Sequence, residues 1–502
     1  MKQAFRRFCC LCLTVLTLCT MVNAHSFTDV PSGHWAEDSI SRGVELGLFN
    51  GTSTATFGVG QSMTRGAFVV LLGRLMDWDT VSSTAPSYTD VATTSWCYSA
   101  VETALANEVI TTQFTTFRPD ESITREEMAV MLIRALGYTT LAGLVQDLSL
   151  PFIDVHTNRG YIAMAYEIGL MTGTTATTFD PSAYTTREQT AVILMRLYDK
   201  LNTQQETYAI VSDLTDTAAL QSQSVIALSV ATLSSGSTPR INPQASTSNQ
   251  QAAIATIHEN GGTALLYLTG TDGAMRGLVS ESVDIIVAYL DTVGYDGLFL
   301  DVAELGSKYR TFYLQLVQAL HESMGDDAPL FVMAEAPSWH GTAYNGYDYG
   351  SLSLNVDRLV LRIAPYTETI DTFLVAPVDP IEEVYYALTH LPSTTDFSAV
   401  SLLITTTANA RTGNSGYDTF TASDVASYLA DADTQIRTSE RYDCGYLMGE
   451  YATGSRTQDV VAWYLNGEQV LSRTQLCDLF GVTAVVLSDG HSLLPDVVAA
   501  LG

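Results

Sequence analysis

A repeat of about sixty residues, present three times before position 202, restricts the fold of this chain more than any other feature. Each copy opens with an aromatic residue, a variable residue and Asp-Val, at Phe27–Val30, Tyr88–Val91 and Phe152–Val155. Each closes with a Thr-Arg pair before an apolar helical stretch, at Thr64-Arg65, Thr124-Arg125 and Thr186-Arg187. The sequence therefore predicts three versions of one structural unit, over residues 25–78, 87–138 and 150–201.

The threonine of each Thr-Arg pair has a local explanation as a helix cap. Two pairs, Thr124 with Glu127 and Thr186 with Gln189, have the spacing of capping boxes. In a capping box the Thr side chain and the side chain three residues later each accept a hydrogen bond from the other residue's backbone N–H at the start of the helix. Copy one has Ala67 at the third helical position, so its box is half missing. Capping does not explain the arginine, since the helix dipole disfavours a cation in the first turn.

This triplet resembles the S-layer homology (SLH) domain, three copies of which form one cell-wall anchor. The resemblance implies an all-α, pseudo-threefold bundle whose grooves bind secondary cell-wall polysaccharide, in many members through an acidic, pyruvylated sugar. It further implies that the arginines hold the anionic group and that the aspartates and tryptophans shape the grooves: Arg65, Arg125, Arg187, Asp29, Asp90, Asp154, Trp35 and Trp96. Arginine suits a carboxylate because its planar fork can bind both oxygens. The alternative is that each arginine pairs with a neighbouring Asp or Glu.

The three copies do not match the SLH pattern equally well. Copy three has Gly160-Tyr161 where the other copies have a tryptophan, and copy one has Ala67 in place of the usual acidic residue. We therefore expect copy two to be the most intact.

The N-terminus has the features of a secretory signal peptide over residues 1–24. Lys2, Arg6 and Arg7 precede an apolar run, which ends in Val22-Asn23-Ala24, an A-x-A-like cleavage site. No other apolar stretch is long enough to cross a membrane. We therefore expect export without a membrane span, and the resemblance to SLH domains implies a location at the cell wall or S-layer.

Charge and cysteine content restrict the partners. The formal net charge of −30 argues against nucleic acid or an anionic bilayer, because both need a basic surface. Cys97, Cys444 and Cys477 remain after the predicted signal peptide and lack metal-ligand spacing, so we expect no metal and no cofactor. The sequence leaves two alternatives for these cysteines, a Cys444–Cys477 disulfide or three buried thiols, and we prefer the thiols.

The second half, residues 208–502, alternates short apolar runs with helical stretches. The eight runs are Tyr208–Val211, Val225–Leu233, Thr263–Leu268, Leu298–Val302, Leu330–Ala334, Leu359–Ala364, Val400–Thr405 and Thr483–Leu487. This pattern predicts an α/β (β/α)8 barrel, and so a multidomain chain. Functional groups in that fold stand at the carboxyl ends of strands, where this sequence has Asp213, Asp301, Glu335, Tyr366 and Asp489.

The stretch Gly294–Leu305 resembles the fourth barrel strand of family 18 glycoside hydrolases, the chitinase-like enzymes. Through Tyr344–Tyr349 and Ala376–Pro380 the second half most resembles the bacterial wall- and spore-associated branch of that family. Asp296, Gly297 and Asp301 fit the pattern Asp-Gly-x-Asp-x-Asp-x-Glu, whereas Phe299 replaces its second Asp and Ala303 replaces the catalytic Glu. In that family a Glu protonates the leaving oxygen while the substrate's acetamide attacks, held by an Asp and a Tyr. The resemblance also implies a small α+β insertion, which includes Asp459–Leu465, before the last strand.

Residue parity sets the candidate catalytic positions. Side chains alternate along a strand, so if Asp301 faces the barrel axis then Ala303 does too, and Glu304 faces away unless a bulge re-aims it. Glu304 is thus either a displaced acid or a carboxylate on a scaffold that lost its acid, and we prefer the second. Tyr366 is near the expected tyrosine position, and Glu335 is a further acid candidate. His340, beside Trp339, is either a sugar contact or part of a packed aromatic corner.

Together these features predict an exported, wall-attached protein with an SLH anchor and a degenerate chitinase-like barrel. The first hypothesis is a non-enzymatic barrel that binds glycans or serves as wall architecture. The second is a weak or altered hydrolase of N-acetylglucosamine-containing polymers such as peptidoglycan, with Asp301 and Glu304 as its acids. A third is an S-layer component in which the barrel only fills space.

Overall fold

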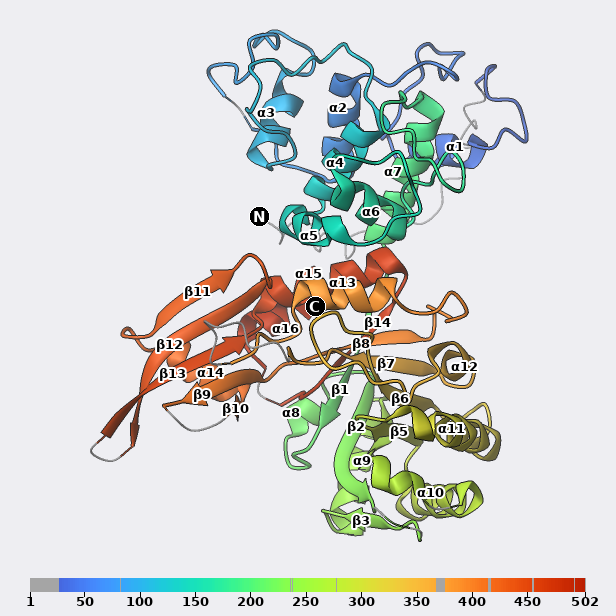
Figure 1. The fold of residues 1–502 in the computed structure, drawn as a ribbon, viewed down its shortest axis with the longest axis vertical. Helices are drawn as coiled ribbons and strands as arrows, with labels where there is room; N and C mark the ends of the chain where they lie inside the picture. Colours follow the sequence, from blue (N-terminus) through green and yellow to red (C-terminus); the bar gives the residue numbers. More distant parts are fainter. Residues whose placement is uncertain are drawn as a thin grey trace. The chain divides into compact units, whose positions relative to one another are not determined.

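The computed structural model describes residues 27–81, 83–234, 236, 238–276, 278–366, 375–413, 417–453, 456–491 and 493–501 (Figure 1). The chain divides into two compact units, Met1–Asn202 and Thr203–Gly502. The predicted signal peptide, residues 1–24, lies outside the described residues.

Each sequence repeat of the N-terminal unit contributes two α-helices. These are α1 (Glu37–Glu45) and α2 (Arg65–Leu75), α3 (Tyr98–Ala106) and α4 (Arg125–Ala135), and α6 (Arg159–Glu167) and α7 (Arg187–Leu201). The short helices α5 (Thr139–Leu144) and η2 (Val145–Asp147) lie between the second and third repeats. Both halves of the predicted capping boxes are present at Thr124 and Thr186. At Thr64 the side chain accepts a hydrogen bond from the backbone N–H of Ala67. The methyl side chain of Ala67 cannot accept a hydrogen bond from the backbone of Thr64, so this capping box is incomplete.

A closed ring of backbone hydrogen bonds joins the three repeats. The N–H of Met63 donates to Thr185 over 2.8 Å, that of Thr185 to Ile123 over 3.1 Å, and that of Ile123 back to Met63 over 2.9 Å. These three residues are buried, and each immediately precedes the capping threonine of its repeat. Buried backbone groups must be paired, so each repeat depends on both of the others. The three copies therefore form one unit rather than a chain of separable modules.

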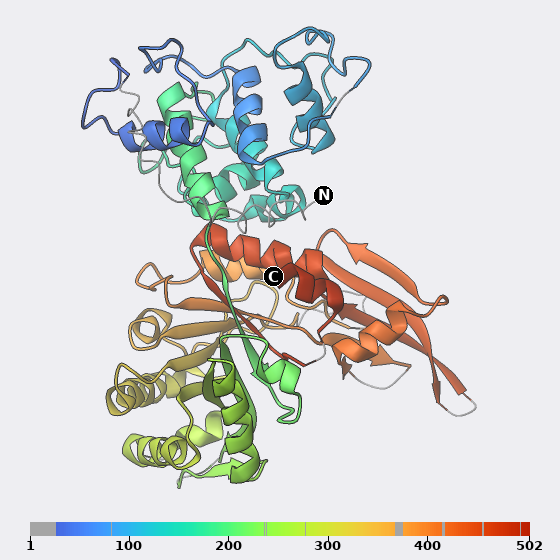
Figure 2. The same ribbon diagram turned by 180° about the vertical axis from the view of Figure 1, so that it is seen from behind.

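The C-terminal unit is a closed barrel of eight parallel strands, seen from behind in Figure 2. In barrel order the strands are β1 (Glu206–Val211), β2 (Val225–Leu233), β4 (Thr263–Gly270), β5 (Gly297–Val302), β6 (Leu330–Glu335), β7 (Arg358–Arg362), β8 (Val400–Ile404) and β14 (Ala484–Leu487). The barrel closes where β1 pairs with both β14 and β2. Each of the eight apolar runs identified in the sequence forms one of these strands, which confirms the predicted barrel.

Helices connect the barrel strands, and one extra strand extends the sheet. The helices are α8 (Thr217–Leu220), α9 (Thr247–Glu259), η3 (Asp272–Arg276), α10 (Val279–Val293), η4 (Ser307–Tyr309), α11 (Arg310–Met324), α12 (Tyr349–Ser353), α13 (Ile381–Thr389), α15 (Gly467–Phe480) and α16 (Pro495–Leu501). Strand β3 (Ile241–Pro243) pairs antiparallel with the carboxyl end of β2.

A five-stranded antiparallel sheet is inserted between β8 and β14. Its strands, in sheet order, are β10 (Tyr417–Phe420), β9 (Ala408–Thr412), β13 (Arg456–Tyr464), β12 (Cys444–Thr453) and β11 (Gln435–Ser439), and α14 (Ala422–Leu429) lies between β10 and β11 in the chain. The segment Asp459–Leu465, taken from the sequence as part of an insertion, lies on β13 and the residue after it. The insert is tied to the barrel by Arg473 of α15, which is fully buried and donates to the carbonyl oxygens of Asp379 and Tyr442 over 2.8 and 3.1 Å.

The three cysteines of the described residues, Cys97, Cys444 and Cys477, are free and buried. The structure therefore contains three buried thiols, as preferred from the sequence, and the alternative Cys444–Cys477 disulfide was wrong. Burial raises the pKa of the Cys444 thiol to about 12, so this group is held in its unreactive, protonated form.

The barrel interior follows the alternation expected from the sequence. Its core includes Tyr267 of β4, Phe299 of β5, Met333 of β6 and Val360 of β7. Counting two residues onward from each places Thr269, Asp301, Glu335 and Arg362 on the inward face at the carboxyl end.

Candidate functional site

Asp301 is held at the carboxyl end of β5 by residues from two other strands. Its side chain is buried. The Tyr267 hydroxyl donates to Oδ2, and the guanidinium of Arg362 donates to both carboxylate oxygens over 2.8 Å each. Burial, followed by the negative charge of Asp301, raises the pKa of the Tyr267 phenol far above its ordinary value. The carboxylate of Asp301 is thus already paired within the protein.

Arg362 also binds a second buried carboxylate. Its Nε and Nη2 lie 3.0 and 2.8 Å from Oε1 of Glu335 on β6. Burial raises the pKa of Glu335 although Arg362 opposes that shift. Burial also acts against the charge of Arg362, but Asp301 and Glu335 outweigh it and raise the guanidinium pKa. One arginine therefore pairs with two of the carboxylates that the sequence had marked as candidates.

Glu304 stands outside this cluster. It follows β5 in a turn, with a backbone φ of +58°, and its side chain is exposed. Its carboxylate interacts with the Tyr344 hydroxyl, whose pKa is raised by burial and then by Glu304. Its backbone N–H faces the carboxylate of Glu335. Glu304 is therefore at the rim, and its role as an acid stays a prediction.

Tyr366 uses its hydroxyl group for a residue other than Asp301. Its hydroxyl donates to Glu382 in the first turn of α13. Its ring stacks on His340, which stacks on Trp339, with ring centres 5.0 and 4.8 Å apart. His340 thus lies in a packed aromatic stack, one of the two alternatives left by the sequence.

Two adjacent buried carboxylates support this stack. Glu383 accepts hydrogen bonds from the Ser338 hydroxyl and from the backbone N–H groups of Trp339 and His340. Burial raises the pKa of Glu382 to about 6. Its Oε2 atom has no hydrogen-bond partner within the described residues.

In the N-terminal unit each Thr-Arg arginine crosses to the next repeat. Arg65, Arg125 and Arg187 donate through Nε to the carbonyl oxygens of Phe117, Phe179 and Phe57 over 2.8 to 2.9 Å. Each guanidinium also lies over the ring of the same phenylalanine, 4.4 to 5.0 Å from its centre. Burial lowers the pKa of all three guanidinium groups. The three contacts form a second cycle, in which each repeat donates to the one that follows it, opposite to the direction of the backbone ring.

The remaining nitrogens of the three arginines have different partners. Nη1 of Arg65 lies 2.6 Å from Glu127 of the next repeat. Nη2 of Arg125 and of Arg187 instead donates to backbone carbonyls, those of Thr172 and Asn50. By the cyclic equivalence, the residues that match Glu127 are Gln189 for Arg125 and Ala67 for Arg187. A single position per repeat therefore decides whether the neighbouring arginine meets a carboxylate.

The three predicted aspartates bind the backbone of their own repeats. Asp29 accepts hydrogen bonds from the N–H groups of Phe57, Gly58 and Val59, and Asp90 and Asp154 accept the equivalent bonds at Phe117 and Phe179. For Asp29, burial is outweighed by these backbone donors, which lower the pKa of the carboxyl. The aspartates thus fix the loop whose carbonyl the arginine contacts.

Trp35 and Trp96 are 61 % and 63 % exposed. A Cβ placed on Gly66 would lie 3.2 Å from the Trp96 ring, so Trp96 borders the first turn of α2. The positions that match Gly66 are Glu126 and Glu188, whose carboxylates accept hydrogen bonds from Asn158 and Gly60 respectively. An exposed ring beside a glycine thus distinguishes the contact between repeats one and two.

Sequence reasoning missed Arg362, Tyr267 and the role of Glu127. Arg362 was detectable, because it is a charged residue inside an apolar strand, two positions after the inward-facing Val360. The Arg65–Glu127 pair was not, since the sequence does not give the cyclic order of the repeats.

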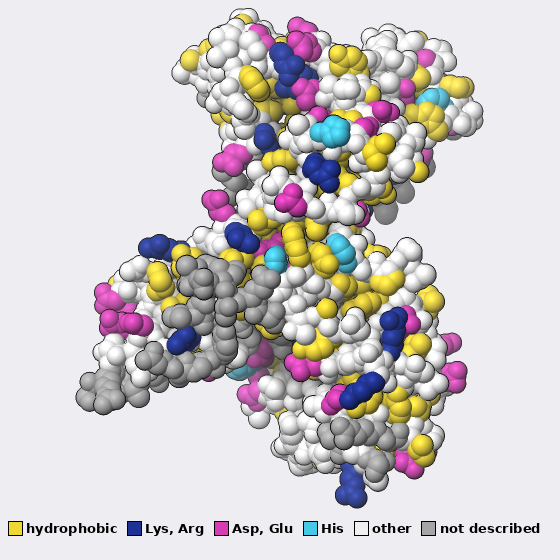
Figure 3. Space-filling model, viewed as in Figure 1, with side chains coloured by type: hydrophobic (Ala, Val, Ile, Leu, Met, Phe, Trp, Pro, Cys, Tyr) yellow, Lys and Arg dark blue, Asp and Glu magenta, His cyan; other side chains and the backbone are white. Residues whose placement is uncertain are grey.

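The described residues contain no group of three or more His, Cys, Asp or Glu side chains arranged to hold a metal ion. No helix in the described ranges is long and apolar enough to cross a membrane. On the face drawn in Figure 3, Lys and Arg side chains are scattered rather than gathered into one patch.

Comparison with known proteins agrees with both units. Residues 26–69, 87–129 and 152–191 match the family model described as S-layer homology domain, so the chain carries three SLH domains. It is 32 % identical over 189 residues to an endoglucanase of Bacillus sp. (strain KSM-635), which covers 36 % of this chain and 19 % of that one. It is 25 % identical over 182 residues to an S-layer protein of Bacillus thuringiensis subsp. finitimus, covering 36 % of this chain and 22 % of that one. The chain therefore spans about a fifth of the length of these relatives.

The barrel is similar in fold to a solved structure, the "C-terminal domain of putative chitinase from Desulfitobacterium hafniense DCB-2". The two share 15 % identity with a TM-score of 0.51, and the match covers 60 % of this chain and 99 % of that one. The C-terminal unit thus has a chitinase-like barrel fold.

Proposed function

We propose that this protein is held at the cell wall by its SLH unit and presents a non-catalytic barrel that binds glycans or serves as wall architecture. The three SLH domains place the protein at the cell wall or cell surface. The observation that carries the proposal for the barrel is Arg362, which pairs with both Asp301 and Glu335.

The anchor binds secondary cell-wall polysaccharide through the grooves between repeats. Arg125 and Arg187 hold the anionic group of the polymer, including a pyruvyl carboxylate where one is present, because Nη2 of each donates to a backbone carbonyl and not, as in Arg65, to a carboxylate. Arg65 contributes less charge, since Glu127 neutralises it. The exposed ring of Trp96 offers a face for a sugar in the groove beside Gly66.

The test is retention of the full chain on purified wall sacculi, with and without their secondary polymer. We expect retention to depend on the polymer and to fall in the double variant Arg125→Gln, Arg187→Gln. The variant Arg42→Gln is a matched control, because it removes an exposed arginine paired with Asp199. Equal retention on sacculi stripped of the polymer would reject the anchor.

The placement of the acids supports a non-catalytic barrel. Ala303 stands where the family pattern has its acid, and Glu304 lies in an exposed turn. Loss of a general acid costs about two to four orders of magnitude in rate. Incubating the full chain with peptidoglycan and with chitin fragments should therefore give no new reducing ends above background.

A second candidate function is weak hydrolysis of N-acetylglucosamine-containing polymers such as peptidoglycan. It is favoured by the interaction of Glu304 with Tyr344, which keeps this carboxylate near the rim. Turnover that is abolished in Glu304→Gln would establish this function and overturn the non-catalytic proposal.

A further inference from the structure

A row of polar side chains crosses the mouth of the barrel beside Asp301. The strand register pairs Asn242 of β3 with Thr232 of β2, Thr232 with Thr269 of β4, and Thr269 with Asp301 of β5. Neighbours in a register lie on the same face of a sheet, and Asp301 faces inward. The row therefore continues the inward face of the barrel onto the extra strand β3.

A bulge in β2 produces this row. The pairing of β2 with β4 shifts between Ser229 and Ala231, so Thr232 rather than Ala231 is placed opposite Thr269. A bulge reverses which residues of a strand face inward beyond it. Without it, an alanine would stand in the row and the polar surface would be interrupted.

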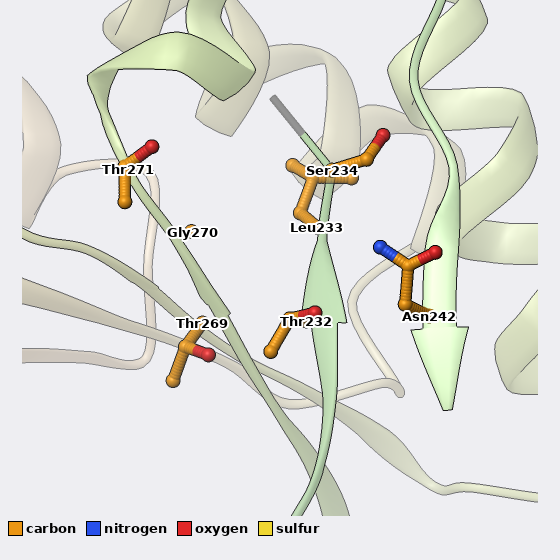
Figure 4. Close-up of a pocket in the computed structure, with 7 residues that line it drawn as sticks. All are labelled: Thr232, Leu233, Ser234, Asn242, Thr269, Gly270 and Thr271. Atoms are coloured by element: carbon orange, nitrogen blue, oxygen red, sulfur yellow. The ribbon is translucent and has the colours of Figure 1, made fainter. Parts of the chain in front are cut away.

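These side chains line a hollow of about 500 Å³ at the carboxyl ends of β2 and β4, drawn in Figure 4. Asn242, Thr232, Ser234, Thr269 and Thr271 supply hydroxyl and amide groups to the lining, together with Leu233 and Gly270. None of these lining side chains is charged. The volume is within the range that small ligands occupy in proteins.

Three of the polar groups have no hydrogen-bond partner among the residues that the structure describes. The hydroxyl groups of Thr232 and Thr269 and the amide of Asn242 make no hydrogen bond to any other described residue, whereas the next member of the row, Asp301, is fully engaged. A threonine hydroxyl both donates and accepts, and an asparagine amide does the same through two atoms. The hollow thus offers neutral donors and acceptors in a line and no ionic partner.

We propose that this hollow is a binding subsite for an uncharged, hydroxyl-rich ring, one neutral hexosyl unit of a glycan that lies across the barrel mouth. Such a ring matches the lining because its hydroxyl groups pair with Thr232, Thr269 and Asn242 without bringing a charge away from water. The inference rests on the proposed glycan-binding function of the barrel and assigns the residues that carry it.

The test measures binding of a neutral probe, the N-acetylglucosamine tetramer, to the full chain by calorimetry. Replacing both hydroxyls in the double variant Thr232→Val, Thr269→Val removes two hydrogen bonds at nearly constant volume. Two such bonds correspond to a loss of affinity of about tenfold or more. Thr263→Val is the matched control, because Thr263 begins the same strand at the opposite end of the barrel.

The outcomes separate this subsite from the wider proposal. Weaker binding by the double variant, with the Thr263 variant unchanged and both equally stable to heat, supports the subsite. Equal binding by wild type and double variant overturns the subsite and leaves glycan binding in place. A wild-type chain that does not bind the tetramer overturns the subsite and, with it, glycan binding by the barrel.

Discussion

Buried arginines occupy a central position in both units, but their surroundings differ. In the N-terminal unit Arg125 and Arg187 contact a phenylalanine ring and backbone carbonyls of the next repeat. In the barrel, Arg362 lies between two carboxylates and donates to both. In the first setting Nη2 of each guanidinium meets a backbone carbonyl, with carboxylates acting on it only at longer range, whereas in the second the guanidinium binds two carboxylates directly.

This difference gives the same type of side chain two different electrostatic settings. A carbonyl orients a guanidinium without neutralising it, so the remaining nitrogens can still attract an anion. A pair of carboxylates satisfies the whole fork and leaves neither partner for a substrate. We therefore propose an acidic ligand for the arginines between the repeats and neutral contacts for the barrel mouth.

The largest expected effect is that of Arg362→Met. Asp301 and Glu335 would then be buried carboxylates without a cation, and breaking a buried ion pair typically costs about 3 to 5 kcal/mol. Urea denaturation at pH 7 should show this loss in the free energy of unfolding of the C-terminal unit. The loss should shrink as the pH falls, because buried carboxyls without a cation titrate at raised pKa values and the folded state then gains protons.

Arg358→Met is the control on the same strand. Arg358 pairs with the half-exposed Glu206, and such pairs contribute about 0 to 1 kcal/mol. An equal loss in the two variants would mean that the double carboxylate contact of Arg362 has no special weight.

A smaller loss is expected for Arg125→Gln in the N-terminal unit. It removes the charge-assisted bond to the Phe179 carbonyl and the contact with the ring, together about 2 kcal/mol. Thermal unfolding followed by circular dichroism measures it. Arg118→Gln, which breaks exposed ion pairs with Glu121 and Glu127, should cost less than about 1 kcal/mol. If the order of these two variants is reversed, the arginine cycle does not hold the repeats together.

Glu382 is a buried carboxylate whose hydrogen bond comes from a tyrosine, in contrast to the two carboxylates that Arg362 binds. Burial raises its pKa from the ordinary value of 4.5 to about 6, with Tyr366, Glu383, Arg441 and Tyr442 as the neighbouring titratable groups. The folded state therefore keeps a proton that the unfolded state loses, so stability is fully present below about pH 4.5 and falls as the pH rises through 6. The total change is about 2 kcal/mol.

Glu382→Gln should remove this pH dependence between pH 4.5 and 6, as measured by urea midpoints across the range. Glu383→Gln is the informative comparison, since Glu383 accepts three hydrogen bonds and its loss should destabilise at every pH. A wild-type midpoint that does not change over this range would contradict the prediction.

Regular patterns allowed much of the fold to be predicted from the sequence. The apolar runs and the Thr-Arg capping signals depend on residues within a few positions of one another, and all eight strands and both complete capping boxes are present. The candidate sites were less accessible because they depend on register across the sheet. The parity argument along β5 assumed that Asp301 faces inward, as it does, but no local signal links it to Arg362, sixty-one positions later.

The smallest expected effect comes from Ala67→Glu, which tests the cyclic equivalence of the repeats directly. The new carboxylate completes the capping box at Thr64 and, by analogy with Glu127 and Arg65, meets Arg187. Stability should rise by about 0.5 to 1 kcal/mol, the usual value of a cap, while retention on polymer-bearing sacculi should fall because Arg187 is neutralised. Ala67→Gln separates the two effects, since it completes the box without a charge and should raise the thermal midpoint without loss of retention. Unchanged retention in Ala67→Glu would show that Arg187 does not hold the anionic group, and the contrast with Arg362 would then apply to Arg125 alone.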